Sequence, residues 1–344
     1  MTPRSILIVK LGAVGDCVHT LYALRALRER FPDARIGWVI EDKSRAVIED
    51  HPDLSEIIRF PRKELAAALR SSGFTRLWRT FRDDLRARGF ETAIDFQNLF
   101  KSGLVARASG APRRIGFRKW REGNFLFTNE RIPRDPVARH AIEKYFTLLR
   151  PLGITTIPDR VEIAVPTDKR DTIDRWFGEN RLDGRRVVAF NPGASWPNKK
   201  LSAHTYAAAA DALADDGCVS VVIWGPGEER DAAAVVESAR SPVLLAPRTD
   251  IRELAALLGR CAMYVGNDSG PMHIAAAMGA RTLGVFGPTD PARVGPWTTR
   301  GRAVQANVTC GPCWTKRCPG PVNCIDRVDA ATLIRACREL LETP

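Results

Sequence analysis

The chain has 344 residues, of which 44% are hydrophobic and 27% charged, and it carries a formal net charge of +12. This length predicts two domains, and the composition is that of a globular protein with sizeable cores. No stretch approaches the roughly 18 consecutive apolar residues of a membrane span, and no secretory signal is visible. We therefore expect a cytoplasmic protein.

The first predicted elements are a buried strand over residues 6–11, a glycine turn that reads GAVGD, and a helix. Apolar residues recur at helical spacing after the turn, at Val18, Leu21, Leu24 and Leu27. Such a turn usually cradles a phosphate, because helix N-terminal N–H groups attract anions, yet Asp16 stands where the phosphate would lie. The residues alone leave two roles open for Asp16: a general base that accepts a proton from an attacking hydroxyl, or a cap of its own helix.

Further strand-like segments alternate with helical patterns. They read RIGWVI, EIIRF and TAIDF in the first half, and VVAFN, VSVVIW, PVLLA, MYVGN and RTLGVFG in the second. Apolar strands separated by helices predict parallel sheets that are covered on both faces. We expect an α/β fold with two Rossmann-like, doubly wound domains, residues 1–165 and 166–344, facing each other across a cleft at the carboxyl ends of their strands. The connection is placed within 150–176, and the C-terminal helix is free to pack back on the first domain.

Positive charge is concentrated between residues 59 and 121, which contain sixteen Lys and Arg against five Asp and Glu. This surplus predicts an anionic partner for the first domain. Nucleic acid is a weaker alternative, because Trp78, Phe81 and Trp120 stand among the arginines at the helical spacing of core residues.

Two loops of the second domain have the residues of a diphosphate site. One reads NPGASWPNKK and contains Ser195 and Lys199, and the other reads NDSGPMH and contains Asp268, Ser269 and Gly270. The N–H groups of Ser269 and Gly270 at a helix start, with a lysine nearby, can hold a diphosphate, although a simple helix cap is the alternative.

Two further residues of this domain are candidates for the same site. His273 stands on the helix that follows the second loop, and Glu228 in WGPGEER can accept hydrogen bonds from ribose hydroxyls. A solvated helix start explains Glu228 equally well.

Four of the eight cysteines form a cluster, Cys310, Cys313, Cys318 and Cys324. Four thiolates can hold zinc, but the irregular gaps of two, four and five residues favour reduced, partly buried thiols in a proline-rich loop. The sequence contains no Asp-x-Asp pair, the usual carboxylate clamp for a diphosphate-bound divalent metal. We therefore expect neither a metal nor a cofactor.

The chain resembles glycosyltransferase family 9, the heptosyltransferases of bacterial lipopolysaccharide synthesis. The resemblance extends from Ile6 to about Trp297, in segments that read ILIVKLGAVGDCVHTLYALRAL, AIDFQNLFKSG, FNPGASWPNKKL and GNDSGPMHIAAAMGARTLGVFGPTDPARVGPW. It implies the two-domain GT-B fold and metal-independent, inverting transfer of a heptose from ADP-L-glycero-D-manno-heptose to the lipopolysaccharide inner core. The implied partners are the ADP-sugar and an anionic lipid A–core acceptor at the inner face of the inner membrane, and no nucleic acid.

The resemblance also assigns roles to individual residues. Asp16 matches the catalytic base, and Lys199 and Ser195 match the loop that binds the donor diphosphate. Asp268, Ser269 and Gly270 match the loop that holds the donor sugar and phosphates, and His273 stands on the helix of this loop. Arg121 in KWREGNFLF resembles an acceptor-binding arginine, and Arg62 and Lys63 fall near another basic acceptor position. Spacing alone places His19 one turn after Asp16 on the same face, where it either orients the acceptor or supports Asp16.

Two features leave alternatives open. The stretch CGPCWTKRC departs from the heptosyltransferase I pattern and resembles other branches, which leaves the acceptor open but not the reaction type. A GT-B transferase of another nucleotide sugar in cell-surface glycan synthesis is the alternative. A nicotinamide-dependent oxidoreductase is the distant alternative. Two features argue against it: GAVGD lacks the three-glycine spacing of a dinucleotide-binding loop, and Glu41 only approximates the acidic residue that binds the ribose.

Overall fold

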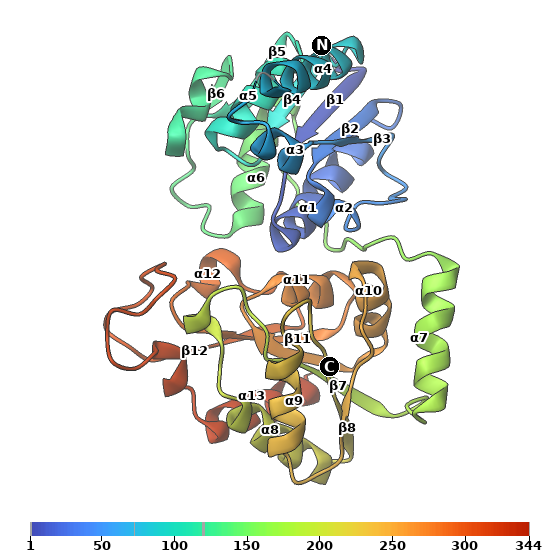
Figure 1. The fold of residues 1–344 in the computed structure, drawn as a ribbon, viewed down its shortest axis with the longest axis vertical. Coiled ribbons are helices and arrows are strands. Elements are labelled where there is room, and N and C mark those ends of the chain that lie inside the picture. The colour runs from blue at the N-terminus through green and yellow to red at the C-terminus, as the bar shows by residue number, and fades with distance from the viewer. Residues whose placement is uncertain (1, 72, 119–120, 344) are drawn as a thin grey trace. The chain divides into compact units, whose positions relative to one another are not determined.

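The structure, a computed structural model, describes residues 2–71, 73–118 and 121–343. The chain divides into two compact units, unit 1 (Met1–Ala164) and unit 2 (Val165–Pro344). Each unit is a parallel sheet of six strands with helices packed on it (Figure 1).

The sheet of unit 1 has the strand order β3-β2-β1-β4-β5-β6. Its strands are β1 (Ser5–Val9), β2 (Arg35–Ile40), β3 (Glu56–Arg59), β4 (Thr92–Asp95), β5 (Arg113–Phe117) and β6 (Glu130–Ile132). Its helices are α1 (Val14–Arg30), α2 (Asp42–Arg45), α3 (Arg62–Ala67), α4 (Gly73–Ala87), α5 (Phe100–Ala108) and α6 (Ala141–Leu149), with the 3-10 helices η1 (Arg121–Leu126) and η2 (Arg150–Leu152).

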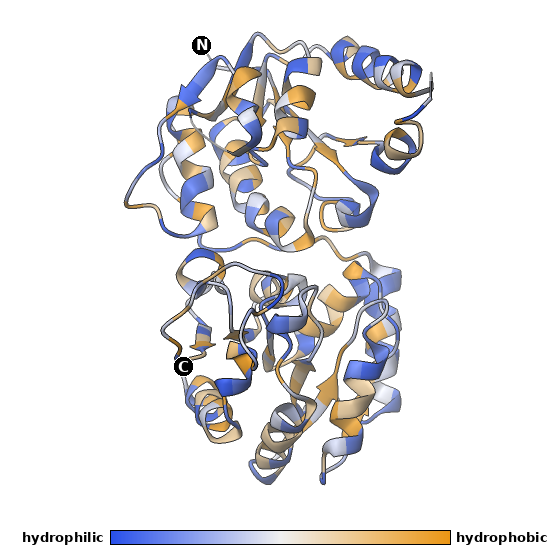
Figure 2. Ribbon diagram, turned by 60° about the vertical axis from the view of Figure 1, so that its left-hand side comes forward, coloured by the Kyte–Doolittle hydropathy of each residue, from blue (hydrophilic) through white to orange (hydrophobic). Residues whose placement is uncertain are grey.

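The central strands of unit 1 are buried because helices cover both faces of the sheet. On one face α4 and α5 contribute to a core that contains Leu7, Val39, Phe81, Leu85 and Val105. The helix α1 packs against α6, as right-handed crossovers in a doubly wound sheet require. In Figure 2 hydrophobic residues follow the strands of both units, and hydrophilic residues follow the outer turns of the helices.

The sheet of unit 2 has the strand order β12-β11-β10-β7-β8-β9. Its strands are β7 (Arg186–Asn191), β8 (Cys218–Val222), β9 (Val243–Leu245), β10 (Met263–Asn267), β11 (Arg281–Phe286) and β12 (Gly301–Gln305). Its helices are α7 (Thr167–Glu179), α8 (Ala203–Asp215), α9 (Glu229–Ser238), α10 (Ile251–Arg260), α11 (Gly270–Ala277), α12 (Pro291–Val294) and α13 (Ala330–Glu342), with the 3-10 helices η3 (Pro197–Lys199) and η4 (Cys324–Arg327).

The C-terminal helix α13 belongs to the core of unit 2. Its residues Leu333, Ala336, Cys337 and Leu340 are buried with the apolar side chains of α8 and the sheet. Among the described residues, no helix is both long and apolar enough to cross a membrane.

In both sheets the strand order reverses beside the first strand, because the first three strands extend to one side of it and the next three to the other. In unit 1 the reversal lies between the paired strands β1 and β4, and in unit 2 between β7 and β10. Loops that leave the carboxyl ends of such a pair diverge to opposite faces, which opens a crevice where ligands of doubly wound sheets bind. The fold therefore defines one candidate site in each unit.

Candidate active site

Asp16 lies at the switch point of unit 1, in the first turn of α1, after the carboxyl end of β1. The N-cap of this helix is Ala13, and no side chain caps it. The Asp16 carboxylate instead contacts the ammonium of Lys10, with Nζ 3.2 Å from Oδ2, and remains 42% exposed. Asp16 is therefore not the N-cap residue, and its carboxylate is open to a ligand.

Lys10 forms the buried floor of this site. Its side chain is 3% exposed, and Nζ donates to the Tyr145 hydroxyl at 2.8 Å, 135 residues further along the chain. Burial by itself lowers the pKa of Lys10, but the charge of Asp16 and the Tyr145 hydroxyl outweigh burial and raise this pKa above its ordinary value. The ammonium therefore stays charged, and Lys10 holds Asp16 without exchanging protons at neutral pH.

The other titratable neighbours of Asp16 also keep their protons. Burial raises the pKa of the Tyr145 hydroxyl to about 12, against the opposing charge of Lys10, and it raises the pKa of the Cys17 thiol to about 12 in the same way. Both groups therefore act as neutral neighbours of Asp16 at neutral pH.

Gln97 occupies the backbone donors of the glycine turn. Its side-chain carbonyl accepts hydrogen bonds from the N–H groups of Leu11 and Gly12, at 3.2 and 3.4 Å. Gln97 follows β4, so the two loops of the switch point are tied together. These two N–H groups already have a protein acceptor, which argues against a phosphate cradle at this turn.

The proposed acceptor residues of unit 1 have different surroundings. His19 is 3% exposed, and its ring packs edge-on against His140, with the ring centroids 5.1 Å apart. Arg62 and Lys63 lie in the exposed first turn of α3. Arg121 begins η1, but its side chain, like Trp120, lies outside the described part of the structure.

Glu41 follows β2 and pairs with basic residues at the carboxyl ends of the strands of unit 1. The carboxylate is 5% exposed and accepts hydrogen bonds from Lys101 at 2.8 Å and from Arg62 at 3.0 Å. Burial raises the pKa of Glu41, but these two cations outweigh burial and lower it overall. Glu41 therefore serves as a counter-ion for basic residues, which is not the ribose-binding role of the oxidoreductase alternative.

The switch point of unit 2 brings together the two loops that the sequence selected. Lys199 ends η3, after β7, and its Nζ lies 2.6 Å from Oδ2 of Asp268, which follows β10. The Thr289 hydroxyl donates to the same oxygen at 2.7 Å. The side chains of Lys199 and Asp268 are 11% and 8% exposed. A lysine ammonium has three donors, so Lys199 can contact a phosphate while it keeps this pair.

Two asparagines that the sequence analysis missed hold these loops. Asn191 ends β7 and donates to the Ser269 hydroxyl at 3.0 Å, while its Oδ1 accepts from the Gly193 N–H. Asn267 ends β10 and donates to the Pro192 carbonyl at 2.8 Å. Each asparagine thus joins its own strand to the loop after the neighbouring strand. The signal was present in the sequence, because both apolar strands end in Asn.

The remaining donor candidates lie around this pair of loops. Glu228 accepts from the Gly225 N–H, and its carboxylate lies over the loop after β7 so closely that a Cβ at Gly193 would be 2.2 Å from Oε2. Ser195 is exposed, and Gly270 begins α11. His273 is only 7% exposed within the same helix. Of these residues, Glu228 and Ser195 are open to a ligand and His273 is largely covered.

The cysteine cluster lies away from both switch points in sequence and is reduced. Cys310 and Cys313 are exposed, Cys318 is half-buried and Cys324 is buried, and none of the four forms a disulfide. Hydrogen bonds from Thr315 lower the pKa of Cys313. Within the described residues, no group of three or more His, Cys, Asp or Glu side chains is arranged to hold a metal ion.

Two doubly wound units of six parallel strands are the architecture of the GT-B fold. The family model that matches the chain, over residues 78–322, is glycosyltransferase family 9 (heptosyltransferase). The chain belongs to this family, which excludes the oxidoreductase alternative.

Individual relatives agree with this assignment. The lipopolysaccharide core heptosyltransferase OpsX of Haemophilus influenzae is 25% identical over 88% of this chain and 84% of its own length. Among solved structures, a family 9 glycosyltransferase from Veillonella parvula has a TM-score of 0.86 at 24% identity, covering 98% of this chain and 97% of that one. The Escherichia coli heptosyltransferase WaaC with ADP has a TM-score of 0.77 at 23% identity, covering 98% and 99%. WaaC with ADP-2-deoxy-2-fluoro heptose has a TM-score of 0.75 at the same identity.

A more distant neighbour in fold is an iron-containing glycosyltransferase. The glycosyltransferase TibC of enterotoxigenic E. coli is described as iron-containing, with a TM-score of 0.57 at 14% identity over 98% of this chain and 76% of that one. A likeness at this level concerns the fold alone.

Proposed function

We propose that this protein transfers a heptose from ADP-heptose to the inner core of lipopolysaccharide. The family and the curated relatives support this activity, and the WaaC complexes support an ADP-linked donor. The observation that carries the proposal within this chain is the half-exposed Asp16 carboxylate, fixed by a buried lysine at the switch point of unit 1.

In the proposed reaction Asp16 accepts the proton of the attacking acceptor hydroxyl. The oxygen attacks the anomeric carbon of the heptose, the bond from that carbon to the diphosphate breaks, and ADP leaves. Attack opposite to the leaving group inverts the anomeric configuration. Lys199 and the N–H groups at the start of α11 stabilise the charge that develops on the diphosphate, which is the role of preorganised donors in such transfers. In this assignment unit 1 binds the acceptor and unit 2 binds the donor.

The variant Asp16→Asn tests the assignment of the base. Asparagine has the shape of aspartate but cannot accept the proton, so we expect the turnover number to fall by about 10²–10⁴, the usual contribution of a positioned acid or base. Donor affinity and melting temperature should stay close to those of the unmodified protein. Glu29→Gln is the matched control, because it removes an exposed carboxylate from the last turn of the same helix. Near-normal turnover by Asp16→Asn would refute the proposed base.

The donor can be tested separately by thermal shift with ADP-, UDP- and GDP-sugars, since a ligand that binds the folded state raises the melting temperature. We expect stabilisation by the ADP-sugar. Stabilisation by a UDP- or GDP-sugar alone would instead indicate a transferase of another nucleotide sugar. The anomeric configuration of the product, read by NMR, tests inversion.

A further inference from the structure

Unit 1 contains a basic cavity at the edge of its sheet opposite Asp16. The cavity has a volume of about 350 Å³ and is lined by Arg82, Arg86, Arg107 and Arg114, with Trp78 and Leu104. Arg82 and Arg86 belong to α4, Arg107 lies in the last turn of α5, and Arg114 is in β5. In a parallel sheet α4 and α5 run from the carboxyl ends of the strands back to their amino ends. This arginine pocket therefore lies towards the amino ends of the strands, whereas Asp16 lies at their carboxyl ends.

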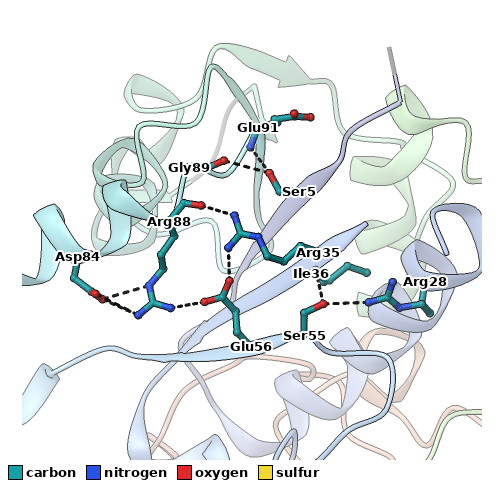
Figure 3. A network of polar contacts seen from close by, with 10 residues as sticks. All are labelled: Ser5, Arg28, Arg35, Ile36, Ser55, Glu56, Asp84, Arg88, Gly89 and Glu91. Carbon is teal, nitrogen blue, oxygen red and sulfur yellow. Dashed lines mark hydrogen bonds and ion pairs between the residues drawn. The ribbon is translucent and has the colours of Figure 1, made fainter. Parts of the chain in front are cut away.

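The neighbouring arginines on this edge have carboxylate partners. Arg88 pairs with both Asp84 and Glu56, and Arg35 pairs with the same Glu56 (Figure 3). Burial lowers the pKa of Arg88, but hydrogen bonds to these two carboxylates outweigh it and raise the pKa overall. The carboxylates of this network are therefore already occupied by arginines outside the pocket.

The arginines of the pocket are much less neutralised. Arg82 pairs with the exposed Asp83 beside it in sequence. As far as the described residues show, no carboxylate pairs with Arg86, Arg107 or Arg114. The pKa of Arg114 is lowered by burial and by the positive charge of Arg107, the opposite of the result for Arg88.

Two of these side chains are held in place by backbone. The Arg114 guanidinium donates to the carbonyls of Phe127 and Ala111 at 2.8 and 2.7 Å. The stem of Arg86 lies against Gly110, where a Cβ would be 3.0 Å from Cγ of Arg86. The structure thus holds unneutralised guanidinium groups around one cavity, where they repel each other, and a bound anion would remove that repulsion.

We propose that the arginine pocket binds a phosphate-bearing ligand. Guanidinium groups form paired, charge-assisted hydrogen bonds with phosphate oxygens, and the indole of Trp78 with Leu104 offers an apolar surface to the rest of the molecule. The volume lies in the range of roughly 300–1,000 Å³ that is typical of small-molecule sites. The ligand is either a soluble phosphorylated compound or the phosphate headgroup of a lipid. The site is independent of the transfer reaction proposed above.

A purely structural role is the competing explanation. A cation in the last turn of a helix stabilises the helix dipole, and Arg86 and Arg107 both stand in last turns. This role accounts for Arg86 and Arg107 taken one at a time. It does not account for Arg114, which lies on a strand, or for the presence of all three arginines around one cavity. It also makes a different prediction, because its loss lowers the melting temperature without any phosphate ligand.

The test compares two double variants of the full chain. Arg86→Gln with Arg107→Gln removes two charges from the pocket, and Arg76→Gln with Arg79→Gln removes two exposed charges from α4 outside it. One arm measures binding of inorganic phosphate and pyrophosphate by calorimetry. The other measures co-sedimentation with phosphatidylcholine vesicles, with and without phosphatidylglycerol.

We expect the pocket variant to lose binding by roughly 10-fold or more for each guanidinium removed, and the matched control to change by less than about threefold. Binding that the pocket variant loses in the calorimetric arm identifies a soluble phosphorylated ligand, and binding that it loses only in the phosphatidylglycerol arm identifies a lipid headgroup; binding that it keeps belongs to another site, such as the proposed diphosphate site of unit 2. The proposal is wrong if the unmodified protein binds in neither arm, or if both double variants lose binding equally. It is also wrong if the pocket variant changes only the melting temperature.

Discussion

The ion pair between Lys199 and Asp268 makes Lys199→Ala an informative change in unit 2. Both side chains are nearly buried, and the carboxylate also accepts a hydrogen bond from the Thr289 hydroxyl. Removing the lysine leaves this buried carboxylate without its cationic partner. The change therefore affects stability as well as donor binding, and the two effects can be measured separately.

The magnitude follows from burial. Breaking a buried pair by removing one partner costs about 3–5 kcal/mol, and for a domain of this size each kcal/mol lowers the melting temperature by roughly 2–4 °C. We expect Lys199→Ala to lower the melting temperature by roughly 6–20 °C. Lys200→Ala is the matched control, because Lys200 pairs with Asp231 with both side chains over one third exposed. An exposed pair contributes about 0.2–1 kcal/mol, so the control should lose at most about 4 °C.

Calorimetry with ADP below the lower melting temperature measures the second effect. Loss of one charge-assisted contact of about 1.5–3 kcal/mol should weaken ADP binding roughly 10- to 150-fold in Lys199→Ala. The double variant Lys199→Met with Asp268→Asn removes both charges, and it should regain most of the stability but not the affinity. Equal melting temperatures for Lys199→Ala and Lys200→Ala would refute the buried-pair reasoning. Normal ADP affinity in either Lys199 variant would refute the phosphate contact.

Three further outcomes are expected. Lys10→Met should fold, because an apolar chain of similar length fills the buried space. Its turnover should fall by up to about 100-fold, because Asp16 loses the group that positions it. The double variant with Asp16→Asn should turn over no more slowly than Asp16→Asn alone. Burial raises the pKa of Asp95 to about 6. Between pH 4 and 6 the folded state therefore keeps a proton that the unfolded chain has released. The free energy of unfolding should fall by up to about 3 kcal/mol as the pH rises from 4 to 6. Urea unfolding should show this step in the unmodified protein and not in Asp95→Asn. Transfer should survive dialysis against EDTA, and a rate that returns only with added Mg²⁺ would contradict metal-independent transfer.

The sequence predicted the strands whose apolar side chains are buried on both faces, such as β1, β7 and β10. It did not predict β5, which begins with Arg113 and Arg114, the short β6, or β12, whose residues are mostly exposed. In these strands charged or polar residues interrupt the apolar run, so no continuous apolar segment marks them, although Ile115 and Phe117 of β5 are buried. A position at the edge of the sheet is not the reason, because the edge strands β3 and β9 were predicted from their apolar residues.

The candidate sites divide in a similar way. Asp16, Lys199 and Asp268 stand in glycine-rich loops next to apolar strands, so local patterns were enough to select them. The contact of Lys10 with Tyr145 joins residues 135 positions apart, and the hydrogen bonds of Gln97 cross from one loop to another. Such partners are fixed by strand order, which no local pattern encodes.

The positive charge between residues 59 and 121 illustrates the same limit. As a sequence feature it is one basic segment, and it predicts one anionic partner. In the fold, Arg62 and Lys101 lie at the carboxyl edge of the sheet, where Glu41 neutralises part of their charge. Arg86 and Arg107 lie towards the amino edge, around a cavity where no such carboxylate is found among the described residues. A doubly wound sheet sends each connecting helix from one edge to the other, so a continuous run of charge becomes two separate surfaces. The arginine pocket therefore offers an anion a second positively charged surface, on the edge away from Asp16, and that edge should be probed with ligands other than the substrates of transfer.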